Sequence, residues 1–126
     1  MHSIVHVKLH PDDKEVRTVG NAAIPHVTRE PRLVMQQNKR LMGRKHGDAE
    51  VERAIAADVF AQPVGRSVTG MYAYKIEDGG RVKWYAAEDV AAMILDFLRA
   101  LAEEKLRHPI DGVVITIPAR FGDIER

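Results

Sequence analysis

The sequence predicts a mixed α/β (α+β) fold, and three observations carry this prediction. Residues 3–9 and 15–19 alternate apolar and polar side chains around a Pro-Asp-Asp turn, which is the pattern of a β-hairpin. Residues 71–76 and 81–85 repeat this pattern around an Asp-Gly-Gly turn, which is a strong hairpin signal. Residues 87–107 carry apolar side chains at the helical spacing of about 3.6 residues. Two hairpins and one long helix are therefore the expected framework.

The composition excludes several functional classes. A length of 126 residues fits one domain or a piece of one, and 45% hydrophobic residues exclude a disordered tail. Nineteen basic against eighteen acidic residues leave a net charge of +1, which argues against a dedicated nucleic-acid-binding protein. The sequence contains no cysteine, so it has no disulfide framework, thiolate metal site or thiol nucleophile.

Neither a membrane span nor an export signal is expected from the sequence. The longest apolar run, residues 90–95, is far shorter than the roughly 20 residues that cross a bilayer. The first residues lack the basic and apolar regions of a signal peptide. We therefore expect a cytoplasmic protein that does not bind membranes.

Proline, glycine and capping residues place the elements between the two hairpins. Pro25 and Pro31 bound a short helical stretch, and residues 32–42 are predicted to form a second helix that ends at Gly43. Asp48 is a favourable N-cap for a helix over residues 49–57. These signals predict a mainly helical connection.

The C-terminal third predicts a helix followed by a buried strand. One face of the helix over 87–107 is apolar, and Pro109 ends it. The members of this apolar stripe are Val90, Ile94, Phe97, Leu98 and Leu101. Residues 112–117 form a nearly continuous apolar run, typical of a strand buried on both faces, and residues 123–126 would begin another helix. A strand buried on both faces needs a layer packed on each side, and so short a chain barely supplies these layers. We therefore expect a piece of a larger α/β domain.

The common catalytic and metal-binding motifs are absent from the sequence. It contains no Walker-type or dinucleotide-binding glycine loop, no nucleophile elbow and no zinc-protease motif. His2, His6 and His10 would share one face of a strand, but each interval of four residues spans about 13 Å. Zinc ligands lie about 2 Å from the metal, so these three histidines cannot share an ion. We expect surface histidines and no metal site.

A basic cluster remains open to two interpretations. Residues 39–45 carry four cations in seven positions. Lysine and arginine are common at a helix C-terminus, where they complement the negative end of the dipole. The alternative is contact with an anion or a phosphate, toward which lysine acts as a point charge.

Three segments resemble a known family. They are Lys-Arg-Leu-Met-Gly-Arg at 39–44, the run 83–106 with Glu-Asp-Val-Ala-Ala-Met-Ile-Leu, and Val-Val-Ile-Thr-Ile-Pro-Ala-Arg-Phe-Gly-Asp at 113–123. In this order and spacing they resemble the nucleotide-binding (ATPase) domain of the DnaK-type seventy-kilodalton heat-shock chaperones. The resemblance implies part of lobe I of an actin-like ATPase fold. Residues 1–86 would be an IB-like subdomain, and residues 87–126 a partial IA-like segment.

The resemblance also implies roles for individual residues. Lys39 matches the family's catalytic lysine, which contacts the γ-phosphate and the attacking water. Pro118 and Arg126 match residues that couple nucleotide state to the peptide-binding domain. Arg120 and Gly122 depart from the family pattern, which usually has an aromatic residue and an asparagine there.

The implied activity is that of a molecular chaperone of the stress response, in which ATP hydrolysis with Mg²⁺ drives peptide binding and release. The family's phosphate loops, metal-coordinating aspartates and adenosine pocket match nothing in these residues. We therefore expect the isolated chain to need no cofactor and to be inactive as an ATPase. Expected partners are the rest of the nucleotide-binding domain, the peptide-binding domain, co-chaperones or an exchange factor, and a second copy through exposed apolar surface.

Two other interpretations stay open. The chain could be a stand-alone, non-catalytic interaction module that acts as an adaptor or decoy for co-chaperones. It could also be a degenerate gene product without a function. The sequence does not separate these two.

Overall fold

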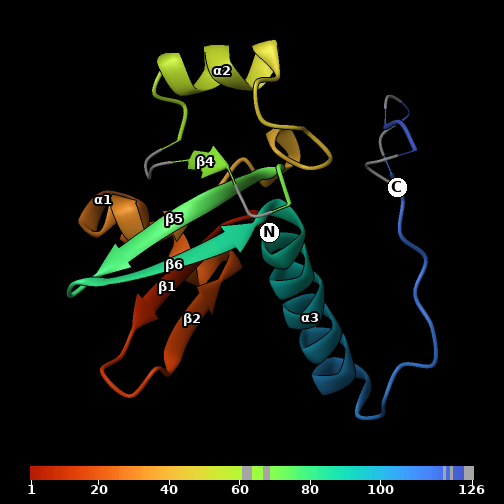
Figure 1. Cartoon of the computed structure of the whole chain (residues 1–126). Coiled ribbons are helices and arrows are strands. Elements are labelled where there is room, and N and C mark those ends of the chain that lie inside the picture. Colours follow the sequence, from red (N-terminus) through yellow and green to blue (C-terminus); the bar gives the residue numbers. More distant parts are fainter. Residues whose placement is uncertain (61–63, 67–68, 118, 120, 124–126) are drawn as a thin grey trace.

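The fold is a mixed α/β arrangement of two antiparallel sheets with helices around them, as predicted (Figure 1). The structure is a computed structural model, and it describes every residue except 61–63, 67–68, 118, 120 and 124–126. One sheet has the order β2-β1-β3 and the other β4-β5-β6. The strands are β1 (Val5–Leu9), β2 (Glu15–Val19), β3 (Val34–Met35), β4 (Val64–Arg66), β5 (Tyr72–Asp78) and β6 (Arg81–Ala86).

Both predicted hairpins are present. β1 pairs with β2 from Val5 opposite Val19 to Leu9 opposite Glu15. β5 pairs with β6 around Gly79 and Gly80, whose φ angles of 56° and 80° suit only residues that tolerate the left-handed region. The short strand β4, which the sequence pattern did not predict, pairs with β5.

The helix predicted over residues 32–42 is wrong. These residues form two 3₁₀ turns, η2 (Pro31–Leu33) and η3 (Asn38–Arg40), with β3 between them. β3 pairs with β1, Met35 opposite Val5, and both Val34 and Met35 are completely buried. Pairing with a distant strand therefore outweighs the local helical pattern.

Among the described residues, three α-helices complete the fold: α1 (Ile24–Arg29), α2 (Ala49–Ala56) and α3 (Ala87–Leu106). They agree with the predicted segments to within one or two residues. A 3₁₀ turn, η1 (Gly20–Ala23), leads from β2 into α1. The Asp48 side chain caps α2 by accepting from the backbone N–H groups of Glu50 and Val51. No helix in the described part of the chain is both long and apolar enough to cross a membrane.

The core lies between the sheets and the first half of α3. Val5 and Val7 from β1 pack with Tyr72, Tyr74 and Ile76 from β5, and all five are at most 1% exposed. At the far end of the hairpins, the Leu9 amide donates to Asp78 Oδ2 at 3.0 Å. These contacts hold the two hairpins together.

The apolar stripe of α3 is covered only in its first part. Val90 and Ile94 are buried, whereas Phe97, Leu98 and Leu101 are 37–41% exposed. Figure 1 shows the reason, because α3 extends well beyond both sheets. The second half of the stripe is therefore only partly covered.

The strand predicted over residues 112–117 does not form. Residues 112–117 pair with no strand among the described residues, and Val114 is 92% exposed. An extended segment becomes a strand only when a neighbour satisfies its backbone groups, and none lies beside this segment. The segment runs back along α3 (Figure 1), and the two line an open apolar groove of about 850 Å³. Beyond Asp123, the predicted start of another helix lies outside the described residues.

Candidate functional site

The structure places Lys39 in the middle of η3, on a well-anchored loop. The neighbouring residues Asn38 and Leu41 are buried, with exposures of 4% and 1%. The Tyr74 hydroxyl donates to the Gln36 carbonyl at 2.8 Å, and α3 contacts η3. The Lys39 side chain is therefore exposed on a loop whose neighbouring residues are buried.

The cations of the 39–45 cluster differ in their partners. Arg44 forms ion pairs with Asp48 at 3.1 Å and Glu50 at 3.3 Å. Arg40 donates from Nε to the Gln37 side chain at 3.4 Å. Lys39 has no acidic partner in the part of the chain that the structure describes. Its ammonium group is thus free to meet an anion.

The helix-dipole interpretation of this cluster loses its basis in the structure. It required an α-helix over residues 32–42, whereas the start of the cluster lies in the three-residue 3₁₀ turn η3. So short a turn has almost no aligned dipole. The phosphate interpretation of Lys39 remains a prediction, supported by its exposure and its unpaired charge.

The two other expected site residues, Pro118 and Arg126, lie outside the described residues. Their coupling role stays a prediction of the sequence resemblance.

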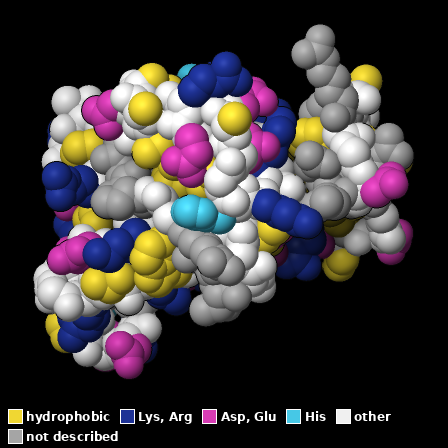
Figure 2. Space-filling view, turned by 45° about the horizontal axis from the view of Figure 1, so that its top comes forward, with side chains coloured by type: hydrophobic (Ala, Val, Ile, Leu, Met, Phe, Trp, Pro, Cys, Tyr) yellow, Lys and Arg dark blue, Asp and Glu magenta, His cyan; other side chains and the backbone are white. Residues whose placement is uncertain are grey.

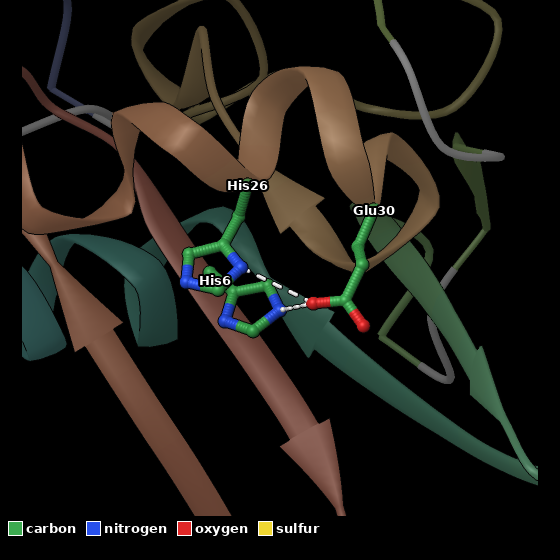
Figure 3. A group of neighbouring side chains, drawn as sticks. All are labelled: His6, His26 and Glu30. Carbon is green, nitrogen blue, oxygen red and sulfur yellow. Dashed lines mark hydrogen bonds and ion pairs between the residues drawn. The ribbon is translucent and has the colours of Figure 1, made fainter.

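The three N-terminal histidines do not form a group. His2 contacts Asn21, with its Nδ1 3.1 Å from Oδ1, and His10 is exposed. The expected surface position is wrong for His6, which is 3% exposed and lies beside His26 of α1 and Glu30, the residue that caps its C-terminus. The ligand atoms of these three residues all fall within 4.8 Å of one another (Figure 3). The two imidazole rings are stacked with centroids 3.8 Å apart and planes 8° apart.

This three-residue group, which we call the His6 cluster, has unusual electrostatics. Burial, followed by the neighbouring His26, holds the pKa of His6 below its ordinary value. The hydrogen bond from Lys8, at 2.7 Å from Oε1, holds the pKa of Glu30 at about 2. A neutral imidazole and an ionised carboxylate therefore lie side by side near neutral pH.

Sequence analysis missed this cluster because its members come from two elements. His26 lies in α1 and Glu30 directly follows its last residue, a separation of four that brings two side chains to the same side of a helix end. That local signal could have been found. β1 reaches these side chains only in the tertiary fold, and no periodic pattern in the sequence indicates that contact.

Charges of both signs cover the face shown in Figure 2. Lysine and arginine side chains alternate there with aspartate, glutamate and hydrophobic side chains. This mixed surface agrees with the near-zero net charge of the sequence.

Comparisons with known proteins give one consistent result. The family model described as "Hsp70 protein" matches residues 6–126. The chain is 32% identical over 111 residues to the "Chaperone protein DnaK" of Akkermansia muciniphila. It is 35% and 34% identical, each over 110 residues, to proteins named "Heat shock 70 kDa protein" from Emericella nidulans and Neurospora crassa.

The matches cover most of this chain but little of each relative. They span 87% of the chain in all three cases. They cover 16% of the Akkermansia protein and 17% of each fungal protein. The chain therefore spans about one sixth of the length of the curated relatives it matches.

Proposed function

Because this chain belongs to the Hsp70 family, we propose that it is part of the ATPase domain of a DnaK-type chaperone. In this proposal residues 1–86 form the outer subdomain of lobe I, and residues 87–126 begin the inner subdomain. The mixed α/β fold with two antiparallel sheets is consistent with such a lobe. The observation that carries the proposal is that the Lys39 ammonium is exposed and unpaired in the described structure, next to the buried residues Asn38 and Leu41.

The proposed chemistry places Lys39 against the γ-phosphate of ATP. A fixed positive charge there stabilises the negative charge that develops during phosphoryl transfer. An exposed lysine that pairs with no carboxylate in the described structure suits this task, because no internal ion pair has to break. Mg²⁺, when bound, would neutralise phosphate charge, and the intact protein would couple hydrolysis to peptide binding and release.

We propose that the isolated chain neither binds ATP with measurable affinity nor hydrolyses it. Lys39 is the single phosphate-contacting residue that the family resemblance assigns to it. Isothermal titration with Mg-ATP should give no saturable heat, and a one-to-one isotherm would contradict the proposal. In the intact protein, Lys39→Ala should abolish hydrolysis. The matched variant Arg40→Ala removes a neighbouring exposed cation and should leave hydrolysis nearly unchanged.

The partners of the chain follow from its uncovered apolar groove. The groove between α3 and residues 110–116 is lined by Leu95, Leu98, Val113, Val114 and Ile115. We propose that the remainder of the ATPase domain packs here, and that the peptide-binding domain and co-chaperones bind the assembled protein. The proposed location is the cytoplasm, where the chaperone would serve the stress response.

An immunoblot of the source cells, with an antibody against this chain, tests the proposal directly. A single band several times larger than 14.1 kDa is expected. A band at the size of the chain itself would instead favour a non-catalytic adaptor or decoy for co-chaperones.

A further inference from the structure

The ligand set of the His6 cluster is that of a transition-metal site. His6 comes from β1, His26 from α1 and Glu30 from the residue that caps the C-terminus of α1. Two imidazole nitrogens and one carboxylate oxygen are ligands that zinc and other divalent first-row metals accept. Figure 3 shows that His6 Nε2 and His26 Nδ1 both point toward the same carboxylate oxygen of Glu30.

The spacing of these atoms is close to that of a coordination shell. His6 Nε2 lies 3.0 Å from Glu30 Oε2, and His26 Nδ1 lies 3.1 Å from the same oxygen. Ligands about 2 Å from a tetrahedral zinc ion are about 3.3 Å apart. Two of the three contacts are therefore within a few tenths of an ångström of this spacing, and all three ligand atoms lie within 4.8 Å of one another.

The buried imidazole of His6 supplies an independent reason to look for a ligand. His6 is 3% exposed, yet neither ring nitrogen has a hydrogen-bond partner. Nε2 is near Glu30, but this contact is an ion pair only when the imidazole is protonated. Buried polar atoms are nearly always satisfied, and an exception calls for a bound ion or water. A metal ion on Nε2 would satisfy that nitrogen.

Binding would change the stacked arrangement of the two rings. A metal ion lies near the plane of each imidazole that ligates it, and two parallel rings cannot both meet this condition. His26 has a side-chain exposure of 28%, so it can turn while the buried His6 stays fixed. The histidine stack is therefore the metal-free state, and its opening is a signature of binding.

Lys8 is the group that opposes an ion at this position. Its ammonium lies 2.7 Å from Glu30 Oε1, while the two histidines face Oε2. The lysine side chain is 49% exposed and can move into solvent. Removing the lysine charge should strengthen cation binding. A variant of Lys8 is therefore expected to bind the ion more tightly.

We propose that His6, His26 and Glu30 bind one divalent transition-metal ion, for which Zn²⁺ is the natural probe. Three protein ligands leave the fourth tetrahedral position to water, as in exchangeable zinc sites. The site is separate from Lys39 and does not depend on the proposed ATPase role. Its effect would be to clamp α1 onto β1.

The test is a titration of the untagged 126-residue chain with ZnCl₂ in a non-coordinating buffer, read by calorimetry and by the thermal unfolding midpoint. One ion per chain is expected, together with a rise in the midpoint. His26→Ala and Glu30→Gln should each weaken binding about tenfold or more, since loss of an outer-sphere partner alone costs that much. Lys8→Gln should bind more tightly than the unmodified chain.

His2→Ala and His10→Ala are the matched controls, because both remove exposed histidines outside the cluster. They should leave the affinity unchanged. Both test variants change partly exposed side chains, and circular dichroism verifies their fold before titration. Absence of zinc binding would overturn the proposal, as would equal affinity of His26→Ala and the unmodified chain or loss of binding in either control.

Discussion

The carboxylate of Glu15 on β2 accepts a hydrogen bond from the hydroxyl of Tyr85 on β6 at 2.6 Å. The same carboxylate meets the Lys83 ammonium at 2.7 Å and also pairs with Arg17. Glu15 and Tyr85 are 70 residues apart in the sequence. One side chain therefore joins the two hairpins on which the fold is built.

This junction should make stability depend on pH. Burial opposes ionisation of Glu15, but the hydrogen bonds from Lys83, Tyr85 and Arg17 outweigh it and hold its pKa at about 2, below its ordinary value of 4.5. The stabilisation is therefore complete above about pH 5 and is lost as the pH falls toward 2. Glu15→Gln should cost about 1–3 kcal/mol at pH 6 and less at pH 3, measured by urea unfolding.

Glu77→Gln is the control for this measurement, because its carboxylate is 61% exposed and pairs with Lys75 on the surface. It should change stability little at either pH. An equal cost of Glu15→Gln at pH 6 and pH 3 would contradict the assigned role of the carboxylate.

The turn between β5 and β6 should tolerate asparagine better than alanine. Gly80 has a φ of 80°, and a Cβ built there would meet nothing within 4 Å. The cost of Gly80→Ala is therefore purely conformational, about 1 kcal/mol of unfolding free energy in chemical denaturation. Gly80→Asn should cost less, because asparagine visits the left-handed region more readily. Equal stability of the two variants would show that the backbone angle is unimportant.

Removal of the α2 cap should destabilise the chain. Asp48 accepts from two backbone amides, at 2.9 and 3.2 Å, and also pairs with Arg44. Asp48→Ala should lower the free energy of unfolding by about 1 kcal/mol. Asp48→Ser keeps a capping oxygen but loses the ion pair, and should retain most of the stability. If serine were as damaging as alanine, the Arg44 pair would be the stabilising contact.

The apolar groove beside α3 should cause self-association of the isolated chain. Val114 and Leu98 expose 92% and 41% of their surface along this mainly apolar groove. Light scattering at rising concentration should show dimers, and Val114→Lys should reduce them. Val82→Lys serves as the control, since Val82 is 49% exposed on β6, away from the groove. A monomer at every concentration would contradict this prediction.

Much of the fold could be predicted from the sequence because its signals are local. The Asp-Gly-Gly turn, the Asp48 cap and the spacing of Val90 and Ile94 act within a few residues, and the corresponding elements are confirmed. The helix over 32–42 failed because β3 gains more by pairing with β1. The strand over 112–117 failed because it needs a neighbour from elsewhere.

The two candidate sites also differ in whether their residues are adjacent in the sequence. Lys39 lies in a contiguous motif, so its position could be read from sequence, and its catalytic role stays a prediction. The family and the fold class are confirmed. The His6 cluster could not be predicted as a whole, because its three residues meet only in the tertiary fold.

The partial covering of α3 gives one helix two different levels of protection. We expect amides near Val90 and Ile94 to open only when the core opens, and amides near Leu101 to open by fraying of the C-terminal end of α3. Deuterium uptake should therefore increase steadily along a single unbroken helix. Any molecule that fills the groove would slow exchange in the second half alone. The exchange gradient along α3 is thus a ready measure of how completely a larger assembly has formed.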